Sequence, residues 1–388
     1  MPSLDEFARE KLADLETRGQ RRELNDTARG AAGKARRNKR DVVSFCCNDY
    51  LNLSQHPAVK QAAIEATQAF GVGSGASRLV TGNHPLFAQL EGRLARFKGT
   101  QAALVFGAGY LANTGIIPSL ARSGDVIFAD ELSHACLMSG ARMSGAQVHV
   151  FRHNDMTHLE TLLSEHRPSA RNALLVTDGV FSMDGDLAPL PELVALANAH
   201  DTWLMTDDAH GLGVVGEGRG SAHAFGEVQL DVPLQMGTLS KAVGGFGGYL
   251  CASQPVIDLL KSRARTLVYS TGLPPASVAA AIAALEIIEH DQARIAKPVD
   301  NAARFCREAG LPAPQSPIVP VIIGDEHEAL AASRMLFDEG FLVTAIRPPT
   351  VPAGTARLRL TFMAEHEPRD ISRLAALVRE RIIGRPAA

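Results

Sequence analysis

The sequence predicts an α/β fold: a large sheet covered by helices on both faces, followed by a small α/β C-terminal domain. Seven short apolar runs have the length and composition of buried strands. Longer segments with helical periodicity lie between most of these runs, and strands that alternate with helices are typical of a sheet covered on both faces. The alternation starts again after the alanine-rich helical segment Ala276–His290, which predicts the second domain.

The seven predicted strands are short and bounded by small or polar residues. They cover Ala102–Phe106, Val126–Ala129, Val148–Phe151, Ala173–Thr177, Thr202–Thr206, Val232–Met236 and Gly248–Ala252. Helical periodicity between them is clearest over Leu86–Phe97 and Leu190–His200. No clear helix separates the last runs, so we expect mixed strand directions at that end of the sheet.

The C-terminal pattern predicts a compact α/β unit. It contains helix Lys297–Ala309, strand Val319–Ile323, helix Glu328–Glu339, strand Leu342–Ala345, strand Arg357–Thr361 and helix Ile371–Ile383. The chain is therefore expected to have three parts: an N-terminal helix and arm (1–45), a large domain (46–290) and a small C-terminal domain (291–388).

The N-terminal arm combines an amphipathic helix with a basic run. Apolar residues recur at helical spacing at Leu4, Phe7, Leu12 and Leu15. The run that follows contains Lys34, Arg36, Arg37, Lys39 and Arg40. A charge run of this kind is usually a solvated connector. The alternative is a contact for the phosphates of an acyl carrier.

Composition narrows the classes of function. The chain has 388 residues, 21% of them charged, and a net charge of −3, which does not indicate a nucleic-acid binder. Its five cysteines include no C-x-x-C pair, which argues against a disulfide framework and a zinc site. The N-terminus is unlike a secretory signal, and no apolar stretch has the length that spans a bilayer. We expect a cytoplasmic protein without a metal, a nucleic-acid partner or a membrane partner.

Reactive residues follow the predicted strands, at the strand ends where α/β sheets bind ligands. Lys241 comes after strand Val232–Met236, within Gly237-Thr-Leu-Ser-Lys-Ala-Val-Gly-Gly245. Apolar and glycine neighbours favour a neutral amine, which can form an imine with a carbonyl group. Thr238 and Ser240 could bind a phosphate or orient the amine. The alternative is a surface lysine on a flexible loop.

Asp207 and His210 follow strand Thr202–Thr206 in the run Thr206-Asp-Asp-Ala-His-Gly211. A carboxylate at this place can hold the proton of a pyridinium nitrogen, and an imidazole can hydrogen-bond a phenolic oxygen. An acidic residue at a strand end also commonly caps the next helix. Taken alone, the run leaves both interpretations open.

Three further strand ends carry candidate contacts. Gly109 and Tyr110 begin a helix-like stretch whose N-terminus suits a phosphate, although glycines often serve only a turn. Ser182 could reach a cofactor oxygen or form an ordinary turn. His134 could stack on a cofactor ring, or it could be a helix cap or a packed side chain.

Together these residues indicate pyridoxal 5′-phosphate (PLP). Lysine, aspartate and histidine come from separate strands, without the spacing of a metal site such as H-E-x-x-H. PLP uses a lysine for its imine and a carboxylate at its pyridine nitrogen. The sequence therefore predicts a PLP enzyme in which Lys241 carries the cofactor.

The order of these motifs and the residues in them resemble those of the fold-type I PLP enzymes and, within them, the α-oxoamine synthases. The resemblance runs from Phe45-Cys-Cys-Asn-Asp-Tyr-Leu-Asn-Leu53 to Ala364-Glu-His366, and includes Gly73-Ser-Gly-Ala-Ser-Arg-Leu-Val-Thr-Gly-Asn-His84. It implies a large, mostly parallel seven-stranded sheet domain with a small C-terminal domain. It also implies a transferase that joins an amino acid to an acyl thioester, with Lys241, His134, Asp207 and His210 as catalytic residues.

Two stretches, Ser77–His84 and Ala345–Thr361, favour the family member that condenses L-alanine with a pimeloyl thioester in biotin biosynthesis. The thioester carrier, CoA or a carrier protein, is left open. The resemblance also assigns Arg359 to the substrate carboxylate and Asn48 to the active site. It assigns Thr271 to the phosphate bound by the neighbouring subunit, so it implies a homodimer with shared active sites.

Three alternatives remain. A sister enzyme, such as glycine C-acetyltransferase or 5-aminolevulinate synthase, would take glycine and another acyl-CoA. A PLP-binding transcription regulator would need an added basic domain, for which this chain has no room. A catalytically inactive subunit, as some partners of serine palmitoyltransferase are, would be expected to lack the lysine, whereas Lys241 is present.

Overall fold

The computed structural model describes residues 2–18 and 20–384, which form two compact units. Unit 1 takes its residues from Met1–Cys46 and Pro320–Leu360, and unit 2 takes its residues from Cys47–Val319 and Thr361–Ala388. The predicted division into an arm, a large domain and a small domain stays a prediction. Among the described residues, no helix is long and apolar enough to cross a membrane.

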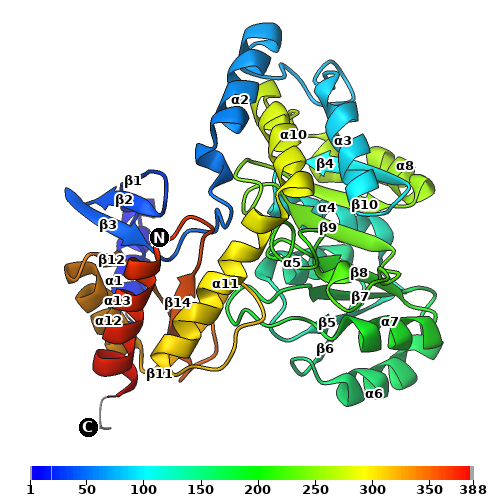
Figure 1. Cartoon of the computed structure of the whole chain (residues 1–388). Coiled ribbons are helices and arrows are strands. Elements are labelled where there is room, and N and C mark those ends of the chain that lie inside the picture. Colours follow the sequence, from blue (N-terminus) through cyan, green and yellow to red (C-terminus); the bar gives the residue numbers. More distant parts are fainter. Residues whose placement is uncertain (1, 19, 385–388) are drawn as a thin grey trace. The chain divides into compact units, whose positions relative to one another are not determined.

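A seven-stranded sheet forms the centre of unit 2 (Figure 1), in the order β4-β10-β9-β8-β7-β5-β6. Its strands are β4 Ala102–Phe106, β5 Val126–Asp130, β6 Gln147–Phe151, β7 Ala173–Asp178, β8 Trp203–Asp207, β9 Leu234–Thr238 and β10 Gly248–Ala252. Within this sheet β10 is antiparallel to both of its neighbours, and β5 to β9 pair in parallel. The predicted fold class and the mixed strand directions are confirmed.

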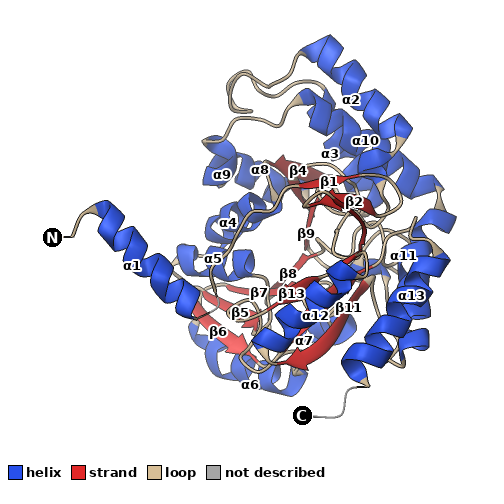
Figure 2. Cartoon of the chain, turned by 90° about the vertical axis from the view of Figure 1, so that its left-hand side faces the viewer, coloured by secondary structure: helices blue, strands red, loops and turns tan. Residues whose placement is uncertain are grey.

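Helices cover both faces of this sheet, and Figure 2 shows them as blue coils around the red strands. On one face lie α4 Gly109–Leu120, α5 Ala135–Ser144 and α8 Gln254–Arg263. On the other face lie α3 Leu86–Phe97, α6 Met156–His166, α7 Leu190–Ala199 and α10 Pro275–His290. Because the strands are buried on both sides, their sequences are continuous apolar runs rather than alternating ones.

The remaining helices of unit 2 pack on this framework. α2 Pro57–Phe70 packs on α10, and α11 Gln292–Ala309 packs on α13 Pro368–Val378. The short helix α9 Arg265–Val268 contacts α4 and α8.

The strand register brings the polar strand ends of unit 2 to one edge of the sheet. Asp178 lies opposite Asp207 in the pairing of β7 with β8. Thr238 lies opposite Gly248, which in turn pairs with Phe106 at the end of β4. The carboxyl ends of β7, β8, β9 and β4 therefore lie at the same edge, as the prediction from the sequence requires.

The described residues of unit 1 form two small sheets and two helices. The first sheet is formed by β1 Thr27–Arg29, β2 Lys34–Arg37, β3 Arg40–Ser44 and β12 Phe341–Leu342. The second has the order β11-β14-β13, with β11 Ile318–Gly324, β14 Ala356–Thr361 and β13 Thr344–Ile346. The helices are α1 Leu4–Thr17, as the apolar spacing predicts, and α12 Glu326–Asp338.

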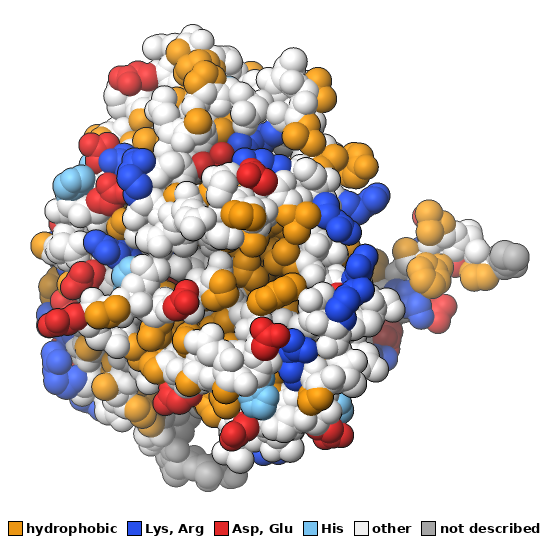
Figure 3. Space-filling view, turned by 90° about the vertical axis from the view of Figure 1, so that its right-hand side faces the viewer, with side chains coloured by type: hydrophobic (Ala, Val, Ile, Leu, Met, Phe, Trp, Pro, Cys, Tyr) orange, Lys and Arg blue, Asp and Glu red, His pale blue; other side chains and the backbone are white. Residues whose placement is uncertain are grey.

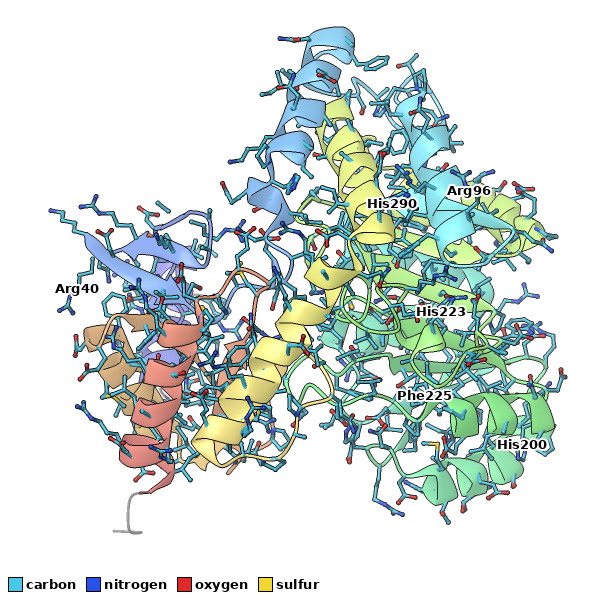
Figure 4. All side chains as sticks on the ribbon, viewed as in Figure 1. Arg40, Arg96, His200, His223, Phe225 and His290 are labelled. Atoms are coloured by element: carbon cyan, nitrogen blue, oxygen red, sulfur yellow. The ribbon has the colours of Figure 1, made fainter. Side chains whose placement is uncertain are left out.

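The basic run forms a β-hairpin rather than a connector, but most of its basic side chains are exposed to solvent, as predicted. The alternative, a contact for the phosphates of an acyl carrier, stays a prediction. β2 and β3 pair in antiparallel fashion, and Asn38 and Lys39 form the turn with φ angles of 51° and 62°. Ala35 and Val42 face each other across the hairpin and pack with Leu342 in a small core. Basic residues at alternate positions hide this apolar pair in the sequence, and charged side chains such as Arg40 project outward (Figure 4).

Two other predicted elements differ from the structure. The predicted strand Leu342–Ala345 is divided between β12, which pairs with β3, and β13, which pairs with β14. The predicted last helix, Ile371–Ile383, starts at Pro368 and ends as an α-helix at Val378, followed by a π-helical turn. In both cases the apolar pattern of the sequence is continuous, but the backbone hydrogen bonds change partner within the segment.

Candidate active site

Lys241 lies beyond the carboxyl end of β9, at the edge of the sheet where the parallel strands β5, β7 and β8 also end. Lys241 contributes to the electrostatics of His134, Cys136 and Asp178, which lie at or just after the ends of β5 and β7. The residue that follows it, Ala242, is buried. The structure thus brings the lysine of one strand end together with the polar residues of two others.

Gly109, Thr238 and Ser240 form a cradle next to this lysine. The hydroxyl oxygens of Thr238 and Ser240 are 2.7 Å apart, and Thr238 Oγ1 also donates to the carbonyl of Gly247 at 2.8 Å. A Cβ at Gly109 would lie 3.5 Å from Cβ of Thr238. Gly109 is the first residue of α4, where backbone N–H groups have no partner within the helix. Such a place fits a phosphate group.

Asp207 ends β8, and neighbouring donors hold its carboxylate. The side-chain amide of Asn113 donates to Oδ2 at 2.7 Å, and the backbone N–H of Ala209 donates to Oδ1 at 3.0 Å. Only 4% of the residue is exposed. Sequence patterns did not single out Asn113, although its place four residues after Gly109 puts both on one helix face.

His134 is the N-cap of α5, and it also faces the site. Its Nδ1 accepts from the backbone N–H of Cys136 at 3.2 Å and lies 2.8 Å from Sγ of the same cysteine. Burial and then the charge of Asp207 raise the pKa of Cys136 to about 12, so the cysteine is a neutral thiol that can donate. Nδ1 is therefore an acceptor, and the neutral imidazole carries its proton on Nε2.

The surroundings of His134 favour its neutral form. Burial lowers the pKa of His134, the charge of Asp207 opposes that effect and the charge of Lys241 adds to it. The backbone N–H of His134 donates to Oδ2 of Asp178 at 2.8 Å. Burial and the charge of Asp207 raise the pKa of Asp178 well above its usual range.

His210 is joined to the segment before α2. Its Nδ1 lies 2.6 Å from the hydroxyl of Tyr50, which is itself 3.5 Å from Oδ1 of Asn48. Tyr50 and His210 are 0% and 5% exposed. Two predicted site residues are thus linked through a tyrosine that sequence patterns did not single out.

The remaining predicted residues lie on separate elements. Tyr110 follows Gly109 in α4 and is 54% exposed, and Ser182 lies in the loop after β7. Thr271 forms an isolated antiparallel bridge with Ser77 and is exposed. Arg359 lies in β14, in unit 1, and is buried. The roles of these residues stay predictions.

A cavity of about 770 Å³ lies at the opposite edge of the sheet, at the amino ends of β8 and β9. Its apolar lining includes Trp203, Leu234 and Leu259, and Figure 3 shows hydrophobic side chains gathered on this face of the molecule. None of the predicted site residues lines it. Parallel sheets bind ligands beyond the carboxyl ends of their strands, so the candidate active site is at the Lys241 edge.

The family model for aminotransferase class I and II matches residues 40–378. The chain belongs to this family. The 8-amino-7-oxononanoate synthase of Methylocella silvestris is 65% identical over 344 residues, which cover 89% of this chain and 98% of the relative. The enzyme of the same name from Beijerinckia indica subsp. indica is 60% identical over 378 residues, which cover 97% and 98%.

A solved structure of SPT with its PLP internal aldimine has the same fold. It is 30% identical and matches 98% of each chain with a TM-score of 0.91. The predicted cofactor and enzyme class are confirmed: the chain is a PLP-dependent acyltransferase within the 8-amino-7-oxononanoate synthase group. The site fits this cofactor, because it offers a phosphate cradle at Gly109, a held carboxylate at Asp207 and a nearby lysine.

Proposed function

We propose that the enzyme condenses L-alanine with a pimeloyl thioester to give 8-amino-7-oxononanoate, carbon dioxide and the free carrier thiol. One observation carries the proposal: Lys241, Asp207 and His134 meet at one sheet edge in a chain 65% identical to an 8-amino-7-oxononanoate synthase. The acyl carrier is CoA or a carrier protein. The names of the relatives imply that the substrates are an amino acid and an acyl thioester. We propose that the amino acid is alanine and that the acyl group is pimeloyl.

The phosphate contacts come from the cradle. The backbone at Gly109 and Tyr110 and the hydroxyls of Thr238 and Ser240 would bind the phosphate, because the N–H groups at the start of α4 favour an anion. Thr271 of the neighbouring subunit would complete this set. Its exposure leaves its hydroxyl accessible to a second chain.

The ring contacts come from the strand ends. His134 would lie against the ring, and Ser182 and His210 would reach its oxygen. Asp207 would hold a proton at the pyridine nitrogen, since Asn113 fixes its carboxylate in a buried place. When bound, PLP withdraws electrons from the α-carbon of the amino acid.

Lys241 would act twice. Its amine would hold the cofactor and, as a free amine, would remove the proton from the alanine α-carbon as a general base. Arg359 would pair with the alanine carboxylate through two parallel hydrogen bonds, and Asn48 would contact the substrate beside Tyr50.

The acyl transfer then follows from simple bond changes. The alanine α-carbon forms a bond to the thioester carbonyl carbon, and the C–S bond breaks. The carrier leaves as a thiolate, which takes a proton from the solvent to become the free thiol. The alanine carboxylate leaves as carbon dioxide, and the protonated Lys241 returns a proton to the same α-carbon. Lys241 therefore ends the cycle as the amine that began it.

Two further parts of the proposal concern assembly and location. The working unit is a homodimer with shared active sites, and the enzyme acts in the cytoplasm. Exposed apolar side chains near Thr271 favour a second subunit that covers them. Tyr269 is close to Thr271 in the sequence, and Val72, Leu79 and Val80 are close to Ser77, which bridges to Thr271.

Turnover with matched substrate pairs tests the proposal. The purified enzyme with PLP is given alanine or glycine, each with pimeloyl-, acetyl- or succinyl-CoA, and the product is identified by mass spectrometry. We expect the highest kcat/KM with alanine and pimeloyl-CoA. A higher value with glycine and a short acyl-CoA would instead establish a sister α-oxoamine synthase.

A further inference from the structure

Asp207 and Asp208 are neighbours in the chain, and both are buried, with 4% and 1% of their surface exposed. They have partners on opposite faces of the sheet. Asp207 accepts from Asn113 of α4, whereas Oδ2 of Asp208 lies 2.8 Å from the ammonium of Lys98, which caps the C-terminus of α3. One carboxylate therefore belongs to the proposed site, and its neighbour forms an ion pair behind it.

The ion pair of Lys98 with Asp208 is fully enclosed. Their side chains are 0% and 1% exposed. The backbone N–H of Ser221 lies 3.0 Å from both carboxylate oxygens of Asp208, and Lys98 also donates to the carbonyl of Arg219. A buried charge without its partner is costly, so each member of this pair depends on the other.

Glycines hold the Asp208 carboxylate in a single place. A Cβ at Gly211 or at Gly220 would overlap its oxygens, and a Cβ at Gly179 would lie 2.9 Å from Oδ1. These three glycines come from the loops after β7 and β8. A carboxylate so confined cannot turn away if the ammonium opposite it is removed.

The enclosed charge is close to the groups of the proposed site. On the site side, Asp207 and Lys241 both act electrostatically on His134, Cys136 and Asp178. Behind it, Asp208, Lys98 and Arg219 act on His223, and both carboxylates act on the buried Tyr249. His223, which is labelled in Figure 4, lies on this second side. Burial, then Lys98 and Arg219, lower the pKa of His223 to about 4.

We propose that Lys98 is a positioning residue of the active site: by cancelling the charge of the confined Asp208 carboxylate, it sets the charge around Asp207. The proposal rests on the proposed function, in which Asp207 holds the proton at the ring nitrogen. Lys98 acts through Asp208 and contacts no reacting atom. Without it, a second negative charge would stand one residue from Asp207, and like charges that share a buried site disfavour each other.

Charge and hydrogen bonding at position 98 are separated by two variants. Lys98→Gln removes the charge and keeps an amide donor, and Lys98→Met removes both. In Lys98→Met/Asp208→Asn both charges are gone. The control, Lys261→Gln, makes the same charge change in the exposed ion pair of Lys261 with Asp258. Each enzyme is loaded with PLP, and the pH midpoint of the visible absorbance of the bound cofactor is measured together with Tm.

We expect Lys98→Gln to raise the pH midpoint by on the order of one unit, because the uncancelled Asp208 charge favours every protonated form nearby. The double variant should return the midpoint toward the wild-type value, and Lys261→Gln should leave it unchanged. If Lys98→Met does not fold, Lys98→Gln and the double variant carry the comparison.

A purely structural role for Lys98 would lower Tm and leave the midpoint in place, and that result would overturn the proposal. Asp207→Asn separates this failure from failure of the proposed function. If Asp207→Asn leaves the cofactor absorbance unaltered, the role of Asp207 is wrong and the proposal for Lys98 is overturned with it. If Asp207→Asn changes the absorbance and Lys98→Gln does not, only the inference on Lys98 is wrong.

Discussion

The hydroxyl of Tyr50 lies 2.6 Å from Nδ1 of His210, although 160 positions separate the two residues in the chain. Both side chains are buried. A contact at Nδ1 fixes the ring of His210, so Nε2 is left to point in one direction. Tyr50 also approaches Asn48, and it therefore ties a proposed substrate contact to a proposed cofactor contact.

We predict that Tyr50→Phe lowers kcat by about tenfold, since one hydrogen bond in a buried network contributes about 1–1.5 kcal/mol. The ring stays in the core, so Tm should change little. Steady-state kinetics with alanine and pimeloyl-CoA measure the effect. Tyr249→Phe is the matched control, because among the described residues the buried hydroxyl of Tyr249 has no hydrogen-bond partner. Equal loss of activity in both variants would contradict the role of Tyr50.

Asn113→Ala should weaken the binding of PLP and slow exchange of the alanine α-proton, each by roughly 10- to 100-fold. Asp207 would lose its side-chain donor at 2.7 Å, which costs about 1–3 kcal/mol when the acceptor is charged and buried. Cofactor titration and exchange in deuterated water measure the two effects. Ser119→Ala, on the same helix, is the control, because the Ser119 hydroxyl donates to the carbonyl of Gly115 and not to Asp207. Wild-type values in Asn113→Ala would show that Asp207 is held without it.

Much of the fold could be predicted because its signal is local. Strands such as Val126–Asp130 and Ala173–Asp178 are apolar on both faces, and the runs have clear ends. The antiparallel β10 could be expected because no helix separates it from β9. The hairpin Lys34–Ser44 was missed because a single pair, Ala35 and Val42, carries its apolar face.

The site residues could be predicted where they follow strands, and their partners could not. Lys241, Asp207 and His134 stand at strand ends, which sequence patterns reveal. Asn113 reaches Asp207 across 94 positions, and Lys98 reaches Asp208 across 110. Contacts over such separations depend on the packing of whole helices against the sheet, and no local pattern encodes them.

His153 should stabilise the fold in a pH-dependent way. Its Nδ1 lies 3.0 Å from Oδ1 of Asp130, and its Nε2 lies 2.8 Å from Oδ2 of Asp186. Burial lowers the pKa of His153, but the hydrogen bonds to the two carboxylates outweigh it and raise the pKa to about 10. Because the folded pKa exceeds the unfolded value of about 6.5, the stabilisation is complete below about pH 6.5 and disappears as pH rises through about 10.

His153→Gln should therefore lower Tm more at pH 6 than at pH 10. A loss of about 1–3 kcal/mol, expected when a part-buried charged cluster loses one member, corresponds to a few degrees in a chain of this size. Calorimetry at the two pH values measures it, and His290→Gln, at the exposed end of α10, is the control. An equal fall in Tm at both pH values would mean that packing alone explains the residue.

Lys241→Ala should fold and still bind PLP, but without a covalent link and with essentially no turnover. The motivation is the position of the amine beside His134 and Asp178 at the strand edge. Borohydride reduction of the wild-type enzyme, followed by peptide mapping, should place the pyridoxyl group on Lys241. A label on another lysine would contradict the assignment of Lys241 as the cofactor lysine. Lys60→Ala, in an exposed part of α2, should keep both the label and the activity.

The last prediction concerns the shared active sites. Thr271 is exposed and pairs through its backbone with Ser77, next to the exposed side chains of Leu79 and Val80. A second subunit that covers this surface would place Thr271 against its own cofactor phosphate. Thr271→Glu should then be inactive as a homodimer, because its carboxylate would repel the phosphate. Lys241→Ala is inactive for a different reason, and each variant keeps what the other lacks.

Mixing the two inactive variants should therefore restore activity. If one subunit supplies Lys241 and the other supplies Thr271, each heterodimer has one site with both lesions and one site with neither, by the two-fold symmetry of an isologous dimer. Random exchange of equal amounts makes half of the dimers mixed, so about one quarter of the wild-type activity should return. Exchange is followed by mass spectrometry of tagged subunits. Proven exchange without recovered activity would show that each chain builds its site alone, since the lesions would then lie in different sites of every heterodimer.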